Sequence, residues 1–160
     1  LGRAGYEWYE ISNWARPGAE CRHNQAYWLD WDWWGAGPGA HSHLGDVRLW
    51  NTKHPVAWAG QIATGHLPVA GHEVIDADSR ELERIMLGIR LREGIALASL
   101  GGAPVTSSDD VGATPSHLVP VVAGLVADEL LDAGAAMRGR AVLTLRGRLM
   151  ADTAVHALTQ

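Results

Sequence analysis

Residues 6–11 read Tyr-Glu-Trp-Tyr-Glu-Ile, and this stretch decides the expected fold of the first part of the chain. Aromatic and β-branched side chains are enriched in strands. Gly5 before the stretch, and Ser12 and Asn13 after it, are residues that commonly bound a strand. We therefore expect one strand at Tyr6–Ile11. A second strand is expected at Trp33–Ala40.

Three glycines, Gly35, Gly37 and Gly39, interrupt the second expected strand. A glycine inside a strand often marks a bulge or a place where a ligand or another backbone comes close. The run is therefore either the wall of a binding site or a tightly packed turn. The sequence of this run favours neither alternative.

The composition changes near residue 72. Seven of the eight tryptophans lie in the first fifty residues, whereas residues 73–160 contain no Phe, Trp or Tyr. Gly65, Pro68 and Gly71 punctuate the chain at this change. We expect two domains, residues 1–72 and residues 73–160.

The second domain begins with a helical pattern. Apolar residues at positions 82, 85, 86 and 89 predict a helix, with Asp78 as its N-cap, Glu81 in its first turn and Gly94 at its end. Residues 101–114 are rich in Gly, Ser, Thr, Asp and Pro, which is typical of a loop.

A second helix is expected from Leu118 to Leu131, with Gly134 as its stop. The turn at residues 138–140 and the alternation that follows it predict a hairpin, and a final helix is expected from about Arg148. Helix, helix, hairpin and helix together resemble a winged-helix layout.

Charge and cysteine content exclude several classes of protein. The 160 residues carry a net charge of −5, so the chain has no overall positive field for nucleic acid. Its single cysteine, Cys21, cannot form an internal disulfide, and cannot supply a four-cysteine zinc site or an iron–sulfur cluster by itself. We expect a cytoplasmic protein, because no signal peptide and no long apolar segment is found.

The segment Cys21–Trp28 gathers side chains that suit a planar aromatic ligand. His23 can bind heme iron through a neutral imidazole, and Cys21 is a second candidate ligand as a thiolate. Tyr27 and Trp28 can stack on a macrocycle. In the structural alternative, His23 and Asn24 cap a helix while the two aromatic residues pack in the core.

Two weaker patterns concern a metal site and a nucleic-acid surface. His41 and His43 lie two apart on an expected strand, but no third ligand follows at a diagnostic spacing, so we expect no structural zinc site. The side chains that support a nucleic-acid-binding wing are Arg138, Arg140, Arg146 and Arg148. Residues 73–160 hold eight Arg and twelve acidic residues, and 8 − 12 = −4, so we expect no nucleic-acid partner.

Taken in order, the motifs of this chain resemble those of the radical S-adenosylmethionine (SAM) heme chaperones, which were long described as oxygen-independent coproporphyrinogen III oxidase-like proteins. The matching segments are residues 4–7, 9–18, 22–24, 27–28, 35–42, 86–91, 93–95 and 143–149. The element His23-Asn24-x-x-Tyr27-Trp28 is the part that separates the chaperones from the true oxidases.

The resemblance implies a fold of the α/β plus α+β class. The chain would be the C-terminal part of a longer protein, with the last strands of a partial (β/α) radical-SAM barrel followed by a small winged-helix-like domain. In such proteins an upstream Cys-x-x-x-Cys-x-x-Cys motif binds a 4Fe-4S cluster, and SAM binds to the cluster. That motif is missing here, so the resemblance implies no catalysis by this chain alone.

The resemblance also implies a function and a site. The function would be to bind heme and transfer it to respiratory enzymes, with His23 as ligand of the heme iron and Asn24, Tyr27 and Trp28 completing the motif. The three glycines at positions 35, 37 and 39 would lie near the cofactor mouth of the barrel. Pro38 departs from the expected small residues and removes an N–H donor there.

Alternatives and partners follow from the same comparison. The alternative function within the family is that of a decarboxylating enzyme of porphyrin biosynthesis. The alternative outside the family is a winged-helix module, formed by residues 78–160, that contacts protein or nucleic acid. The implied partners are heme and a heme-accepting respiratory protein, and a homodimer and transient membrane association are compatible with the family. An incomplete barrel exposes a strand edge, so residues 1–72 are expected to aggregate or to depend on a partner.

Overall fold

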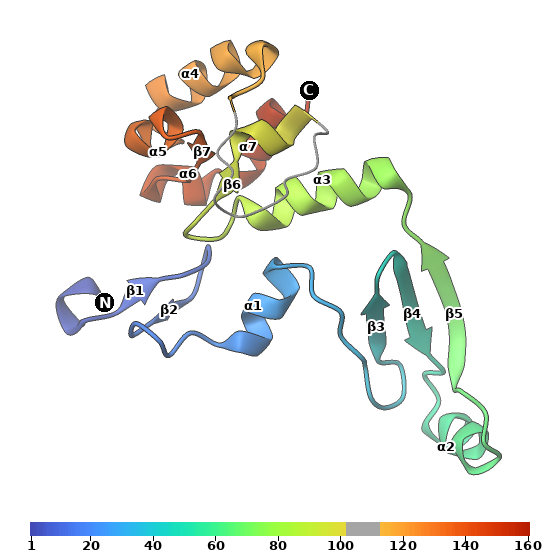
Figure 1. Ribbon diagram of the computed structural model, residues 1–160. Helices are drawn as coiled ribbons and strands as arrows, with labels where there is room; N and C mark the ends of the chain where they lie inside the picture. The colour runs from blue at the N-terminus through green and yellow to red at the C-terminus, as the bar shows by residue number, and fades with distance from the viewer. Residues whose placement is uncertain (102–112) are drawn as a thin grey trace. The chain divides into compact units, whose positions relative to one another are not determined.

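The computed structural model describes residues 1–101 and 113–160, which form two compact units (Figure 1). One unit is discontinuous in sequence and joins Leu1–Leu29 to Glu81–Gln160, and the other unit is Asp30–Arg80. These bounds differ from the expected domains 1–72 and 73–160, which remain a prediction. The expected loop at residues 101–114 lies almost entirely outside the described residues.

The unit Asp30–Arg80 contains an antiparallel three-stranded sheet of order β3-β4-β5 and one helix. Its elements are β3 (His41–Leu44), β4 (Val47–Asn51), α2 (Pro55–Ala63) and β5 (Val69–Val74). Gly45, with φ of 57°, makes the tight turn between the first two strands. Pro55 stands in the first turn of α2, where its missing N–H has no helical partner to lose.

The strand expected at Trp33–Ala40 is wrong. Trp33 makes an isolated antiparallel bridge to His43, and the regular strand begins only at His41. The physical reason is the backbone of the glycine run. Gly37 and Gly39 have φ values of 107° and 68°, which lie outside the region that strands occupy.

The discontinuous unit is largely helical, and its elements come from both of its segments. Residues 1–29 contribute η1 (Gly2–Ala4), β1 (Glu7–Trp8), β2 (Trp14–Ala15) and α1 (Arg22–Trp28). The later segment contributes most of α3 (Ala77–Gly88), then β6 (Ile95–Ala96), η2 (Leu97–Gly101), η3 (Ser116–Leu118), α4 (Val119–Ala127), α5 (Ala133–Met137), β7 (Arg140–Ala141), α6 (Leu145–Leu149) and α7 (Ala151–Leu158).

The hydrophobic core of this unit lies in its later segment. Ile89, Leu97, Ala141 and Ala154 are each 0% exposed, and they come from four different parts of the segment. Burying a side chain of the size of Ile or Leu stabilises the fold by about 1.5–3 kcal/mol. Residues 1–29 are joined to the later segment by a backbone hydrogen bond, in which the Arg92 N–H donates to the Tyr9 carbonyl at 3.1 Å.

The strand expected at Tyr6–Ile11 is shorter than predicted. β1 covers two residues and pairs with β2, with Glu7 opposite Ala15 and Trp8 opposite Trp14. All strand pairs between named strands in the described ranges are antiparallel. The barrel strand expected here therefore has no parallel neighbour in the described part of the chain.

The helix expected at residues 82–89 is confirmed as α3, but its ends differ. Asp76, not Asp78, caps it, because the Asp76 carboxylate accepts the Ser79 N–H at 2.8 Å and the Ser79 hydroxyl at 2.9 Å. These hydrogen bonds hold the pKa of Asp76 below its ordinary value. The helix ends at Gly88, and Gly94 lies in a later turn with φ of 59°.

The second predicted helix is confirmed as α4, but it ends at Ala127. Glu129, with φ of 59°, then reverses the chain. Gly134 is not a stop, because it lies inside α5.

The hairpin predicted around residues 138–140 is also wrong. Met137 is helical, and Arg140–Ala141 pair with β6, more than forty positions earlier in the chain. The final helical region begins at Leu145 as α6 and continues as α7, slightly earlier than expected. No helix within residues 1–101 or 113–160 is long and apolar enough to cross a membrane.

Candidate functional site

The candidate site is built on α1, a helix of seven residues that starts directly after Cys21. Helical side chains four positions apart lie one turn apart on the same face. His23 and Tyr27 therefore share one face of α1, and Asn24 and Trp28 share the adjacent face. The structure brings all four predicted heme-motif residues together on one element.

His23 and Tyr27 form a contact pair at the surface. The Tyr27 hydroxyl lies 3.4 Å from His23 Nε2, and the two rings meet edge to face with centroids 5.1 Å apart. Both residues are exposed. An exposed imidazole beside a phenol is accessible to an external planar ligand, and the tyrosine ring restricts the orientation of the imidazole.

The adjacent face of α1 is anchored to its own unit. Asn24 Nδ2 donates to the hydroxyl of Tyr9 at 3.3 Å, and Tyr9 is 5% exposed. The indole N–H of Trp28 is buried and has no hydrogen-bond partner among the described residues. A buried donor without a partner costs free energy, so Trp28 contributes packing rather than a hydrogen bond.

Cys21 is a free, exposed cysteine at the N-cap position of α1, and its side chain makes no capping hydrogen bond. Its thiol stays a second candidate iron ligand. Among the described residues, no group of three or more His, Cys, Asp or Glu side chains is placed to hold a metal ion.

The glycine run belongs to the other unit, where local contacts explain its composition. The Gly35 N–H donates to Ser42 Oγ at 2.9 Å, and a Cβ at Gly35 would overlap the carbonyl of His41. The buried Asn51 side chain donates to the Gly37 carbonyl at 2.9 Å. These contacts favour the packed-turn alternative, while the placement of Gly39 and its neighbours beside a cofactor remains a prediction.

His41 and His43 have different surroundings. His41 is exposed and lies beside Trp50, with ring centroids 6.1 Å apart. His43 is 3% exposed, and its Nε2 lies 3.0 Å from Asp30 Oδ1. The second histidine therefore contacts a cluster of charged side chains inside the unit.

That cluster was missed by sequence reasoning. Asp30 contacts both His43 and Arg80, whose Nη2 lies 3.1 Å from Asp30 Oδ2. Arg80 Nη1 also lies 3.1 Å from a carboxylate oxygen of Asp46. The one sequence signal is an aspartate between aromatic residues, and it says nothing of partners 13 and 50 positions away.

The four arginines of the expected wing lie in different surroundings. Arg148 lies over Trp8, with its guanidinium carbon 4.3 Å from the ring centroid, and 5.7 Å from the centroid of Trp14. Burial lowers the pKa of Arg148 from its ordinary value. Arg148 is thus a packing residue that joins the two segments of its unit, and the hairpin that would present a wing is absent from the described structure.

The chain is similar to several known proteins along most of its length. No family model matches the chain. A curated protein of Mycobacterium tuberculosis, the heme chaperone HemW, is 47% identical over 158 residues, which is 99% of this chain and 36% of that protein. The heme chaperone HemW of Synechocystis is 35% identical over 117 residues, 71% of this chain and 28% of the relative.

A mitochondrial relative from Bos taurus, radical S-adenosyl methionine domain-containing protein 1, is 33% identical over 110 residues, 59% of this chain and 23% of its own length. Among solved structures, coproporphyrinogen III oxidase (HemN) from Escherichia coli, described as a radical SAM enzyme, matches with a TM-score of 0.65 and 17% identity. The match covers 100% of this chain and 38% of that one, and it shows the fold alone. The chain thus spans about a third of the length of the first of these curated relatives.

Proposed function

This chain is a homologue of the radical SAM heme chaperones, and from that premise we propose that its protein binds heme as cargo and passes it to a heme-accepting respiratory protein. The sequence resemblance is confirmed by relatives named as heme chaperones, at 47% identity over 99% of the chain. The observation that carries the proposal is the exposed imidazole of His23 on α1, beside Tyr27.

The proposed site uses both faces of α1. His23 Nε2 supplies the axial nitrogen for heme iron, and Tyr27, which lies against that imidazole, supplies an aromatic edge for the macrocycle. Asn24 holds the helix to Tyr9, so the histidine is presented from a fixed position. Trp28 is half-buried on the same face of α1 as Asn24.

The radical SAM cofactors belong to a different part of the proposed protein. Three cysteines are needed for the family's cluster motif, and this chain has one cysteine. The residues described here therefore do not fit a 4Fe-4S cluster, and no step is derived through the cluster or through SAM. We assign both groups to the remainder of a longer protein, where they would supply the family's redox chemistry.

The finer assignments are part of the same proposal. We place the protein in the cytoplasm and give residues 1–72 the role of barrel end and residues 73–160 that of the family's C-terminal helical domain. A homodimer and transient membrane association are compatible with a carrier that delivers heme to respiratory enzymes. Neither decarboxylation nor nucleic-acid binding gains a supporting observation from the described residues.

The test is a heme titration of the intact protein, followed by absorbance in the Soret region. We expect saturable binding that His23→Ala weakens by at least about tenfold, the loss expected when one axial ligand is removed. The matched control is His156→Ala, which removes an exposed histidine from α7.

Two outcomes would contradict the assignment. Equal loss in His156→Ala would show that heme adheres to exposed histidines in general. Unchanged heme binding in His23→Ala would show that another side chain binds the iron. Cys21→Ser then tests the second candidate. Tyr27→Phe removes the hydroxyl beside Nε2 but keeps the ring, and we expect it to retain binding.

A further inference from the structure

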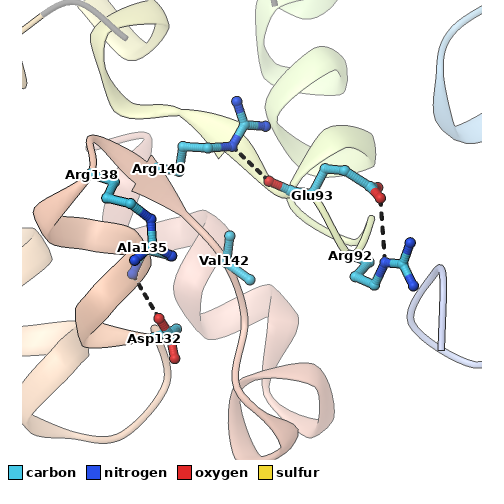
Figure 2. A pocket seen from close by; sticks show the side chains of 7 residues that line it. All are labelled: Arg92, Glu93, Asp132, Ala135, Arg138, Arg140 and Val142. Atoms are coloured by element: carbon cyan, nitrogen blue, oxygen red, sulfur yellow. Dashed lines mark hydrogen bonds and ion pairs between the residues drawn. The ribbon is translucent and has the colours of Figure 1, made fainter. Parts of the chain in front are cut away.

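A pocket of about 480 Å³ lies in the discontinuous unit, within its later segment. Its lining residues are Arg92, Glu93, Asp132, Ala135, Arg138, Arg140 and Val142. Figure 2 shows that three arginines from different parts of this segment border one space. The volume falls within the range of about 300–1,000 Å³ that small-molecule sites occupy.

Some of the charged side chains that line the pocket are paired with other groups, and some are not. Arg92 is paired, because its Nη1 lies 2.5 Å from Glu7 Oε2 and its Nε lies 3.4 Å from Glu93 Oε1. The Asp132 carboxylate is also engaged, since it accepts the Ala135 N–H at 2.7 Å and caps α5. The two carboxylates of the lining thus serve other groups.

Arg140 is held in place without being neutralised. Its Nε donates to the Glu93 carbonyl at 2.8 Å, and its Nη2 donates to the Gly94 carbonyl at 3.0 Å (Figure 2). Carbonyl oxygens fix the guanidinium but carry no formal charge. The positive charge of Arg140 is therefore oriented, and no carboxylate in the described part of the chain forms a direct ion pair with it.

The guanidinium of Arg138 has no hydrogen-bond or ion-pair partner among the described residues, while the backbone N–H of this residue donates to the Ala135 carbonyl at 2.9 Å. Its Nη1 lies back along α5, 3.4 Å from the position that a Cβ on Gly134 would occupy. Lack of a side chain at Gly134 leaves room for the guanidinium at the pocket. Arg138 therefore retains all five of its donors for a ligand.

Ala135 and Val142 add apolar surface to the lining. Two guanidinium groups without a direct ion pair among the described residues, beside apolar surface, suit a ligand with an apolar body and an anionic head. Guanidinium groups bind carboxylates through paired, charge-assisted hydrogen bonds. We propose that this pocket binds a small organic carboxylate, with Arg138 and Arg140 as the residues that contact its oxygens. This site is separate from α1, and the proposal does not depend on heme binding.

The test uses benzoate as probe and benzamide as its neutral counterpart of the same shape, each titrated into the intact protein by calorimetry. We expect saturable benzoate binding, and at least about tenfold weaker binding of benzamide, because only the former carries the charge. Arg138→Gln is expected to weaken benzoate by about tenfold without lowering the melting temperature, since the side chain has no internal partner.

The matched control is Arg146→Gln, an exposed arginine on α6 that does not line the pocket and lies 3.9 Å from Glu129. It should leave benzoate affinity unchanged. Equal weakening in this control, equal binding of the two probes, or absence of benzoate binding would each overturn the proposal. Arg140→Gln provides a second variant, expected to weaken benzoate in the same direction.

Discussion

Asp30 shows how a single residue holds part of this chain together. It adopts a positive φ of 56° and contacts both the buried His43 and the half-buried Arg80. Aspartate tolerates this backbone region better than most residues, because its short polar side chain can bond locally. One side chain therefore serves the backbone turn and the ion-pair cluster at once.

Removing Asp30 is expected to destabilise its unit. Asp30→Ala removes the carboxylate that contacts both the buried His43 and the half-buried Arg80, and losing polar contacts to such groups costs about 1–3 kcal/mol. Urea unfolding of the intact protein measures this loss. Asp30→Asn keeps the backbone preference and part of the hydrogen bonding, so its loss should be smaller.

The matched control for this change is Asp46→Ala. Asp46 contacts the same Arg80, but its side chain is 68% exposed, so its loss should be within about 0.5 kcal/mol of zero. Equal losses in the two alanine variants would show that burial of the His43 contact is unimportant.

At the scale of single elements, α3 is a helix whose start depends on one carboxylate. Asp76 accepts two hydrogen bonds from Ser79, and these bonds favour its ionised form. The pKa of Asp76 is therefore lower in the folded chain than in the unfolded chain. Its stabilising contribution is present above the unfolded pKa of about 3.9 and is lost as the pH falls through the lower folded value.

Asp76→Ala should accordingly lower the melting temperature at pH 7, and the difference from the wild type should shrink as the pH falls below about 4. Thermal unfolding followed by circular dichroism at several pH values measures it. Asp78→Ala is the matched control, because Asp78 lies in the first turn of α3 but does not cap it. A pH-independent difference for Asp76→Ala would contradict the capping role.

These elements show what sequence could predict. Apolar spacing found α3 and α4, because a helix leaves a periodic signal in its own residues. It misplaced their ends, since the cap at Asp76 and the reversal at Glu129 depend on backbone geometry. The pairing of Arg140–Ala141 with Ile95–Ala96 is a long-range contact that no local pattern encodes.

The sequence likewise predicts some of the site residues and not others. His23, Asn24, Tyr27 and Trp28 could be predicted because they lie within one short helical segment. The pocket around Arg138 could not, because its lining comes from residues as far apart as 92 and 142. Arg140 was noted in sequence as part of a wing, yet it binds the backbone of the Glu93–Gly94 turn.

At the scale of the whole molecule, Arg148 joins distant parts of the chain. Its guanidinium packs on Trp8 and Trp14, which lie in the first segment of the same unit. Arg148→Ala removes this cation–π contact and its packing, with an expected loss of about 1–2 kcal/mol in the free energy of unfolding.

Chemical denaturation followed by tryptophan fluorescence measures this loss, and Trp8 and Trp14 contribute to the signal together with the other six tryptophans. Arg146→Ala, in the same short helix, should change the free energy by less than about 0.5 kcal/mol, since Arg146 is 60% exposed. If the two variants were equally stable, the contact of Arg148 with the first segment would be energetically neutral.

The discontinuous unit also dictates an order of events during synthesis. Asp30–Arg80 is continuous and closes its sheet through neighbouring strands, so its strand pairing needs no residue from outside the unit. Residues 1–29 are made before Asp30–Arg80, yet Tyr9 and Trp8 meet their partners only when Arg92 and Arg148 have emerged. Residues 1–29 thus find their place only after later residues of the chain have been made, and Trp8 and Trp14 stay uncovered until Arg148 has emerged.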